Sequence, residues 1–368
     1  MSRFRTPLSL PKSHGAQASP VDSERRCRNA FTCPDPPQGR MKTNPGGRRG
    51  LRRLAGILAA GALAIVATAA AEPFAYVTNQ GDHSVSVIDL ATGRSAATIA
   101  VGEGPAGVAV SRDGHKVFIS DPKTSSLYRL DGLTHHLEAR ASLGQGPLGI
   151  ALSPDAGRVY VADWFEDRLY VLDAVTLTQV ASIPVGDAPS GVAVSPDGSR
   201  VFVSDRDDNQ VSVVDTERLE VIARITTGER PFGLCVDPAG RRLYVANVAS
   251  NDVSVIDTRT LHPIATIRVG STPYGVAVTP DSARVFVTNQ HDNSISVIDA
   301  KQLAVTAQPE MGDFPEGIVV DPSGERVYVA SWFSNELLII DSSSLELIQS
   351  IQTGDGPRAF GVFVAGGS

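Results

Sequence analysis

The fold is decided by a phrase that the chain contains twice, "YVTNQGDHSVSVID" at residues 76–89 and "FVTNQHDNSISVID" at residues 286–299. The two copies begin 210 residues apart, which is five steps of 42. Stepping by 42 from Ala75 divides the chain into seven segments with no insertion or deletion: 75–116, 117–158, 159–200, 201–242, 243–284, 285–326 and 327–368. An uninterrupted internal period of this length indicates a repeat architecture.

Every segment follows one pattern, which residues 159–200 illustrate: "VYVADWFEDRLYVLDAVTLTQVASIPVGDAPSGVAVSPDGSR". Four short runs alternate apolar and polar residues or are rich in β-branched residues, with turn residues between them, as in short antiparallel strands. Because a four-stranded sheet cannot bury both of its faces alone, the segments have to pack on one another. We therefore predict an all-β protein, a seven-bladed β-propeller of four-stranded antiparallel blades without helices.

The two ends of the repeated region predict how the ring closes. The first segment begins on "AYVTN", which matches the second strand of a blade. The chain ends on "RAFGVFV" at residues 358–364, which matches the first strand. The C-terminal strand can therefore complete the first blade, so that no blade keeps an unpaired edge.

The runs "YVTN", "VSVID", "GVAVSPDG" and "RVYV" resemble the YVTN-type repeat of YncE-like periplasmic and surface-layer β-propellers, and this resemblance covers residues 75–368. It implies a seven-bladed propeller in which the "GVAV" strand is innermost. It implies little about chemistry, because propellers include binding modules, scaffolds and several kinds of enzyme.

The first 71 residues differ from the rest in composition. Residues 1–40 are rich in Pro, Arg and Ser, and we predict a disordered extension or a start codon assigned too far upstream. Residues 41–71 place arginines before the apolar run 54–71 and end on small residues, which predicts a signal peptide and a periplasmic or secreted protein. The alternative is an uncleaved membrane anchor, since 18 apolar residues are borderline for spanning a bilayer.

Removal of residues 1–71 makes the charge strongly negative. That segment holds 12 Lys/Arg and 3 Asp/Glu of the chain's 33 and 40, which leaves 21 basic and 37 acidic residues and a formal charge of −16. Such a domain repels nucleic-acid phosphates and favours a cationic or basic partner. Cys235 is the only cysteine outside the leader, so we predict no disulfide framework and a domain held together by its core. We also expect a monomer and no cofactor.

One aspartate recurs at the end of the third strand of every segment. Seven equivalent carboxylates cannot all be catalytic, whereas an aspartate there can accept hydrogen bonds from the backbone of the following turn. We interpret the whole set as structural: Asp89, Asp131, Asp173, Asp215, Asp257, Asp299 and Asp341.

The candidate site residues are those that differ between segments on one face of the ring. The loops that cross between blades lie on this face, and the residue after each crossing proline should surround the mouth of the channel. These residues are Ala106, Leu148, Ser190, Phe232, Tyr274, Glu316 and Arg358. The last four would suit a small ligand with a ring and a charged group. The alternative is ordinary variation at an exposed position, with Glu316 and Arg358 paired to each other.

The loops between second and third strands lie on the same face and hold both tryptophans of the chain. Trp164 and Phe165 occupy positions equivalent to those of Trp332 and Phe333. Exposed pairs of this kind would anchor a ligand or partner. The alternative is that both pairs pack over their loops.

Carboxylates are frequent on this face. The crossings carry Glu103, Asp187, Glu229, Asp313 and Asp355, which again favours a cationic partner. Asp205, Asp207 and Asp208 form a weak candidate for a calcium site, because their spacing differs from that of an EF-hand.

These observations predict a non-catalytic binding or scaffold module that acts through its variable face. One alternative is a propeller enzyme of lactonase or lyase type at the channel mouth, with Glu316 and Arg358 in acid–base roles. A second alternative is an accessory protein of a periplasmic quinoprotein system. The negative charge argues against single-stranded nucleic acid stacked on the tryptophans.

Overall fold

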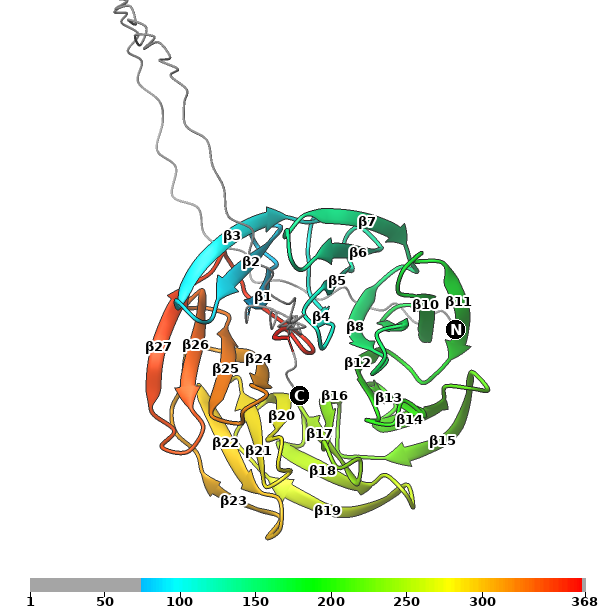
Figure 1. Ribbon diagram of the computed structural model, residues 1–368. Coiled ribbons are helices and arrows are strands. Elements are labelled where there is room, and N and C mark those ends of the chain that lie inside the picture. The colour runs from blue at the N-terminus through cyan, green and yellow to red at the C-terminus, as the bar shows by residue number, and fades with distance from the viewer. Residues whose placement is uncertain (1–73, 366–368) are drawn as a thin grey trace, which may run out of the picture. The chain divides into compact units, whose positions relative to one another are not determined.

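The computed structural model describes residues 74–365, which form a closed ring of seven antiparallel sheets around a central axis (Figure 1). Within these residues every regular element is a strand, so the predicted all-β seven-bladed propeller is confirmed. No helix in this part of the chain is long and apolar enough to cross a membrane. The expectations for residues 1–40 and 41–71 lie outside the described residues.

The blades follow one another along the chain. The first contains β1 (Phe74–Asn79), β2 (Ser84–Asp89) and β3 (Arg94–Ala100), and the second contains β4 (Val108–Val110), β5 (Lys116–Asp121), β6 (Ser126–Asp131) and β7 (Leu137–Ser142). The third contains β8 (Pro147–Leu152), β9 (Arg158–Asp163), β10 (Arg168–Asp173) and β11 (Gln179–Pro184), and the fourth contains β12 (Pro189–Val194), β13 (Arg200–Asp205), β14 (Gln210–Asp215) and β15 (Glu220–Thr226). The fifth contains β16 (Pro231–Val236), β17 (Arg242–Asn247), β18 (Asp252–Asp257) and β19 (His262–Arg268), and the sixth contains β20 (Pro273–Val278), β21 (Arg284–Asn289), β22 (Ser294–Asp299) and β23 (Ala304–Ala307). The seventh contains β24 (Pro315–Val320), β25 (Arg326–Ser331), β26 (Glu336–Asp341) and β27 (Leu347–Gln352).

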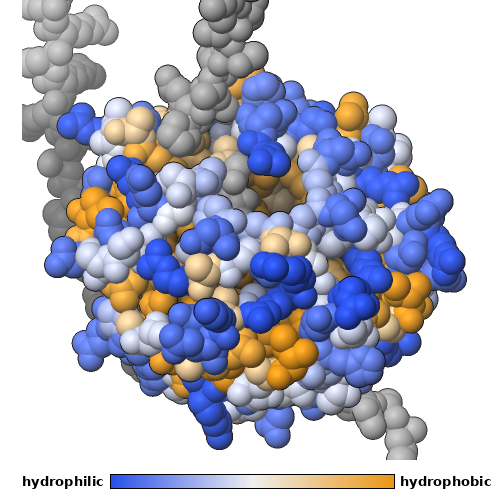
Figure 2. Space-filling model, turned by 60° about the horizontal axis from the view of Figure 1, so that its bottom comes forward, coloured by the Kyte–Doolittle hydropathy of each residue, from blue (hydrophilic) through white to orange (hydrophobic). Residues whose placement is uncertain are grey.

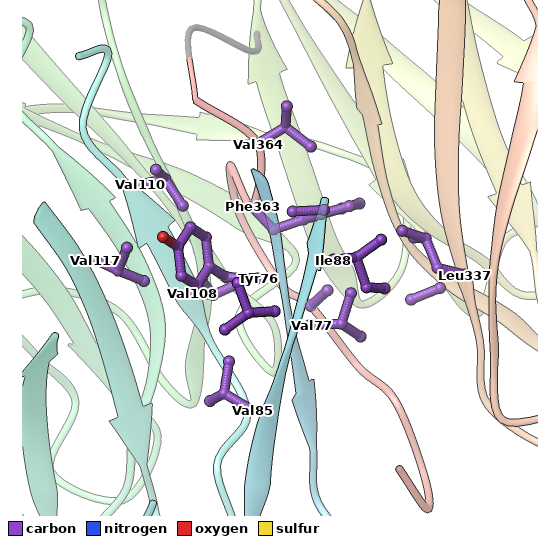
Figure 3. Packing of buried hydrophobic residues seen from close by; sticks show 14 of the residues in the cluster. Tyr76, Val77, Val85, Ile88, Val108, Val110, Val117, Leu337, Phe363 and Val364 are labelled. Carbon is purple, nitrogen blue, oxygen red and sulfur yellow. The ribbon is translucent and has the colours of Figure 1, made fainter. Parts of the chain in front are cut away.

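The ring closes at the first blade, as predicted, but through isolated bridges instead of a regular strand. Val364 pairs with Ala75 and Pro357 pairs with Asn79, both antiparallel. Residues 357–364 therefore lie beside β1 in the position of the innermost strand, which the three-stranded first blade otherwise lacks. On its other side this closing segment pairs in parallel with β4, where the Val108 N–H donates to the Phe360 carbonyl at 2.7 Å. Phe363 and Val364 pack among the core residues of the first blade (Figure 3).

The hydrophobic core lies between the blades, because each sheet is buried on both faces. Six apolar clusters each join residues of neighbouring blades. The second strand of every blade contributes one aromatic side chain that is at most 3% exposed: Tyr76, Phe118, Tyr160, Phe202, Tyr244, Phe286 and Tyr328. These equivalent rings act as wedges that hold the blades at a regular angle.

A glycine near the start of each inner strand lets neighbouring inner strands approach closely. A Cβ atom added at Gly149 would lie 1.8 Å from the Ser190 carbonyl oxygen of the next blade. Equivalent contacts of 2.0 to 2.5 Å, all to a backbone oxygen of the next inner strand, occur at Gly107, Gly191, Gly233, Gly275 and Gly317. Since no real Cβ atom tolerates such distances, the packing of the inner strands requires glycine.

The recurring aspartates at the ends of the third strands are structural, as predicted. In the first blade, Asp89 Oδ1 accepts hydrogen bonds from the backbone N–H groups of Ala91 and Thr92, at 2.8 and 3.1 Å. All seven aspartates make the same pair of bonds. Each carboxylate therefore caps the turn that leads to the outer strand.

We predict that Gly149→Ala destabilises the protein by roughly 1–3 kcal/mol, because the added methyl group forces backbone apart at the axis. Gly157→Ala in the same blade is the matched control, since its Cβ would meet only the Asp155 side chain, at 3.2 Å or more. Urea unfolding followed by circular dichroism measures both variants. Equal stability of the two variants would contradict the role assigned to the inner-strand glycines.

Candidate functional site

Three aromatic rings meet across the axis of the ring at the face of the blade crossings. Phe232, the second residue of β16, stacks on Tyr274 of β20 with ring centroids 4.2 Å apart. Phe360 of the closing segment lies 5.3 Å from Phe232 and 5.2 Å from Tyr274. Since β16 belongs to the fifth blade and the closing segment to the first (Figure 1), these contacts reach across the axis of the ring.

Arg358 lies beside these rings and connects several blades. Its guanidinium is 4.3 Å from the Trp332 ring centroid and 5.3 Å from that of Phe360. Its Nε donates to Gln80 Oε1 at 2.9 Å, and its Nη1 donates to the Tyr274 hydroxyl at 3.4 Å. The side chain is 19% exposed, so Arg358 is a largely buried cation held by two aromatic faces and by polar neighbours.

Glu316 of β24 is buried next to Arg358, with Oε2 3.6 Å from Nη1. Its Oε1 accepts a hydrogen bond from Gln290 Nε2 at 3.0 Å, whereas Oε2 has no hydrogen-bond partner among the described residues. Burial raises the pKa of Glu316 from 4.5 to about 7, although the charge of Arg358 opposes this change. The expected pairing of Glu316 with Arg358 is therefore present, whereas the expected exposure is wrong, because Glu316 is only 2% exposed.

In each of the two tryptophan–phenylalanine pairs, the tryptophan points toward the axis and the phenylalanine toward the solvent. Trp164 turns inward, 6.4 Å from Phe232, and the Arg206 guanidinium lies over its ring at 5.2 Å. Phe165 and Phe333 point outward and are 45% and 56% exposed. We call Trp164, Phe232, Tyr274, Glu316, Trp332, Arg358 and Phe360 the axial cluster.

Six residues of the axial cluster are predicted from the sequence, whereas Phe360 and the polar partners Gln80 and Gln290 are not. A signal for Phe360 existed, because it is the only aromatic residue at its position in the repeat. The equivalent residues are Val108, Ile150, Val192, Leu234, Val276 and Ile318.

The weak calcium candidate is not assembled. Asp205 is buried and its Oδ2 accepts hydrogen bonds from Ser212 Oγ and Gln210 Nε2, whereas Asp207 pairs with Arg206 and Asp208 accepts from the Asp187 N–H. The three carboxylates thus interact with different neighbours and do not form a common site. Within residues 74–365 no group of three or more His, Cys, Asp or Glu side chains is arranged to hold a metal ion.

A cavity of about 540 Å³ runs along the axis and ends at the axial cluster. Phe232, Tyr274 and Phe360 form its floor, and the inner strands form its walls. It extends to the turns at the other ends of these strands, where Pro154 and Pro196 belong to its rim. Figure 2 shows a hollow at the centre of the ring with apolar residues inside it. The cavity is therefore open on the face of the uniform turns, opposite to the face of the predicted site residues.

Comparisons with known proteins support the fold. The model of a family described as "Lactonase, 7-bladed beta-propeller" matches residues 126–272, from β6 to the end of the fifth blade. No curated protein matches this chain.

Solved structures of similar architecture include a hydrazine synthase of Kuenenia stuttgartiensis, 24% identical over 69% of this chain and 88% of that chain, with a TM-score of 0.63. A functionally unknown protein from Desulfotomaculum acetoxidans DSM 771 is 15% identical over 78% of this chain and 99% of that chain, with a TM-score of 0.68. The dihydro-heme d1 dehydrogenase NirN, in complex with DHE, is 18% identical over 78% of this chain and 74% of that chain, with a TM-score of 0.61. At these identities the likeness concerns the fold alone.

We predict that Asp205→Asn stabilises the protein above about pH 6. Burial raises the pKa of Asp205 from 3.8 to about 6, so the folded state binds the proton more tightly and stability falls as the pH rises through this window. Asparagine occupies the equivalent position at Asn79, Asn247 and Asn289. At about 1.4 kcal/mol per pKa unit the gain is roughly 1–3 kcal/mol, measured by urea unfolding at pH 8 and pH 4.

The matched control for Asp205→Asn is Asp121→Asn, at the same position of another blade. Asp121 Oδ2 accepts hydrogen bonds from the backbone N–H groups of Glu103 and Gly104, and Oδ1 accepts from those of Lys123 and Thr124. An asparagine amide has a single acceptor oxygen, so it can keep only one of these two pairs. This variant should lose stability at pH 8. The same sign for both variants at pH 8 would contradict the difference between the two carboxylates.

We also predict a pH-dependent effect of Glu316→Gln. Because the folded-state pKa of Glu316 is raised to about 7, the carboxylate costs stability increasingly as the pH rises from about 5 to about 8. The melting temperature of the variant, relative to the wild type, should therefore increase over this range, as measured by differential scanning fluorimetry. The exposed Glu346→Gln is the control and should show a constant difference. A constant difference for Glu316→Gln would mean that Glu316 is ionised throughout.

Proposed function

We propose that this chain is an exported YVTN-type, YncE-like propeller that acts as a non-catalytic binding module through the face of the crossings. The observation that carries the proposal is the exposure of Phe165 and Phe333, which lie in loops directly beside the inward-pointing tryptophans. Exposed aromatic side chains on a rigid scaffold are typical anchors for a partner. Phe333 is held in place by Phe314, whose ring centroid is 4.9 Å away.

The charge around these anchors favours a basic partner. Glu103, Glu229, Asp313 and Asp355 are exposed on the crossings of this face. Arg358 does not neutralise them, since it is buried and paired within the axial cluster. A peptide or protein segment that combines arginine or lysine with aromatic residues would satisfy both features of the surface.

The second candidate function is that of a lactone-hydrolysing enzyme. It is favoured by the partial match to the lactonase family and by the free Oε2 of Glu316, a carboxyl group whose pKa of about 7 suits proton transfer. Against it, the described side chains around Glu316 are Gln290, Arg358 and Tyr274, which include no second carboxylate or histidine. Burial further raises the pKa of the Tyr274 hydroxyl, so it stays protonated.

The test uses a short synthetic peptide of alternating arginine and tyrosine, titrated into the full chain by isothermal calorimetry. We expect binding that weakens with salt and that falls about tenfold or more in the double variant Phe165→Ser/Phe333→Ser, the loss of two aromatic anchors. The control is Leu133→Ser/Val175→Ser, which alters two side chains, each 61% exposed, in the turns of the opposite face.

Hydrolysis of dihydrocoumarin by the same samples distinguishes the two functions. A binding module leaves the rate at that of the uncatalysed reaction. Turnover by the wild type that is lost in Glu316→Gln would replace the proposal by the enzymatic alternative. Equal peptide binding by both double variants, or none by the wild type, would also overturn it.

A further inference from the structure

The axial cavity is a second potential site, separate from the face of the crossings. Its volume of about 540 Å³ lies within the range of small-molecule pockets. One position of the inner strands holds small residues around most of the ring, among them Ala109, Ala151, Ala193 and Gly361. These residues line the cavity with little side-chain volume, and Ala109 and Ala193 also pack against the core clusters between blades.

The walls of the cavity are suited to an uncharged ligand. They are formed mainly by valine, leucine, isoleucine, alanine and proline side chains, and Arg112 at the rim is the only charged residue among those that line it. Cys235 also lines the cavity, and burial raises the pKa of its thiol to about 12, so the thiol is neutral. A charged group placed between these walls would lose its hydration without gaining a partner.

The rim adds a barrier to anions. Each of four turns around it carries an aspartate directly after the rim residue: Asp113, Asp155, Asp197 and Asp281. A serine or threonine hydroxyl of the same turn donates to each carboxylate at 2.5 Å, which keeps its pKa below the usual value. The four carboxylates are therefore ionised at neutral pH and already have hydrogen-bond donors, so they repel anions without being organised to bind a cation.

The floor favours an aromatic ligand over an aliphatic one. Phe232, Tyr274 and Phe360 present three adjoining rings to the cavity, and an aromatic molecule can stack on them or meet them edge to face. We propose that the axial cavity binds a neutral aromatic small molecule that enters between the turns and rests on this floor.

Two dyes with one scaffold test the charge of the ligand. N-phenyl-1-naphthylamine is neutral, and 8-anilino-1-naphthalenesulfonate carries one sulfonate on the same rings. We expect the neutral dye to bind the full chain with a rise in fluorescence, and the sulfonate to bind at least about tenfold more weakly. Arg112→Pro, which introduces the residue found at equivalent turns, should leave binding of the neutral dye unchanged. Equal affinity for both dyes, or sulfonate binding that Arg112→Pro abolishes, would overturn the proposal.

A cavity-filling variant tests the location of the dye. Ala193→Trp should reduce binding of the neutral dye about tenfold or more by occupying the space between the walls. Ala304→Trp on the exposed outer strand β23 is the matched control and should bind like the wild type. Wild-type affinity in a folded Ala193→Trp variant would place the dye elsewhere.

Reaction of Cys235 gives an independent readout that needs no change in the cavity. In the full chain with Cys27→Ser and Cys33→Ser, 4,4′-dithiodipyridine at about pH 9 reports the reactivity of Cys235 alone, since the alkaline pH increases the small thiolate fraction that its raised pKa leaves. The neutral dye should slow this reaction severalfold when it fills the cavity. An unchanged rate at saturating dye would overturn the proposal even if Ala193→Trp does not fold. The Phe165→Ser/Phe333→Ser variant should retain dye binding, so this result is separate from the function proposed for the other face.

Discussion

The close approach of backbone between neighbouring inner strands sets the dimensions of the whole ring. Carbonyl oxygens of one strand lie where a side chain of the preceding blade would otherwise begin, as at Gly149 and Gly233. Because this distance is set by backbone atoms, the radius of the channel does not depend on side chains that differ between blades. The buried aromatic wedges then hold the sheets at a constant angle, and the cavity and its floor follow from these two constraints.

The repeat predicts a great deal because it constrains register. A strict period assigns every residue to a strand, a face and a height, which is why the blades, the capped turns and the ring closure agree with expectation. Register does not determine how deeply a side chain at a given position is buried. Glu316 and Arg358 occupy a position that sequence reasoning could interpret as the exposed mouth of a channel. Arg358 is covered by the rings of Trp332 and Phe360, and Glu316 lies between Gln290 and Arg358. These contacts join segments that are far apart in the sequence, and no local pattern contains them.

The sequence does not reveal the face on which the cavity opens, for a related reason. Variation between repeats draws attention to the crossings, whereas the cavity opens among turns whose sequences are nearly the same. Its walls consist of backbone and small side chains, which leave no motif. Equivalent positions also differ in chemistry in ways that sequence cannot reveal. Asp121 and Asp205 share one place in the repeat, yet Asp121 accepts four backbone hydrogen bonds and Asp205 retains an oxygen without a partner.

The closing segment links the integrity of the ring to the integrity of its site. Residues 357–364 supply Phe363 and Val364 to the core of the first blade, and the same few residues supply Arg358 and Phe360 to the axial cluster. Arg358 in turn contacts Gln80 of the first blade and Glu316 of the seventh, the two blades that the closure joins. An open ring would therefore lack both the floor of the cavity and the partner of the buried carboxylate. Since a ligand on that floor binds only the closed state, its binding energy adds to the stability of the closure, where isolated bridges replace a regular strand.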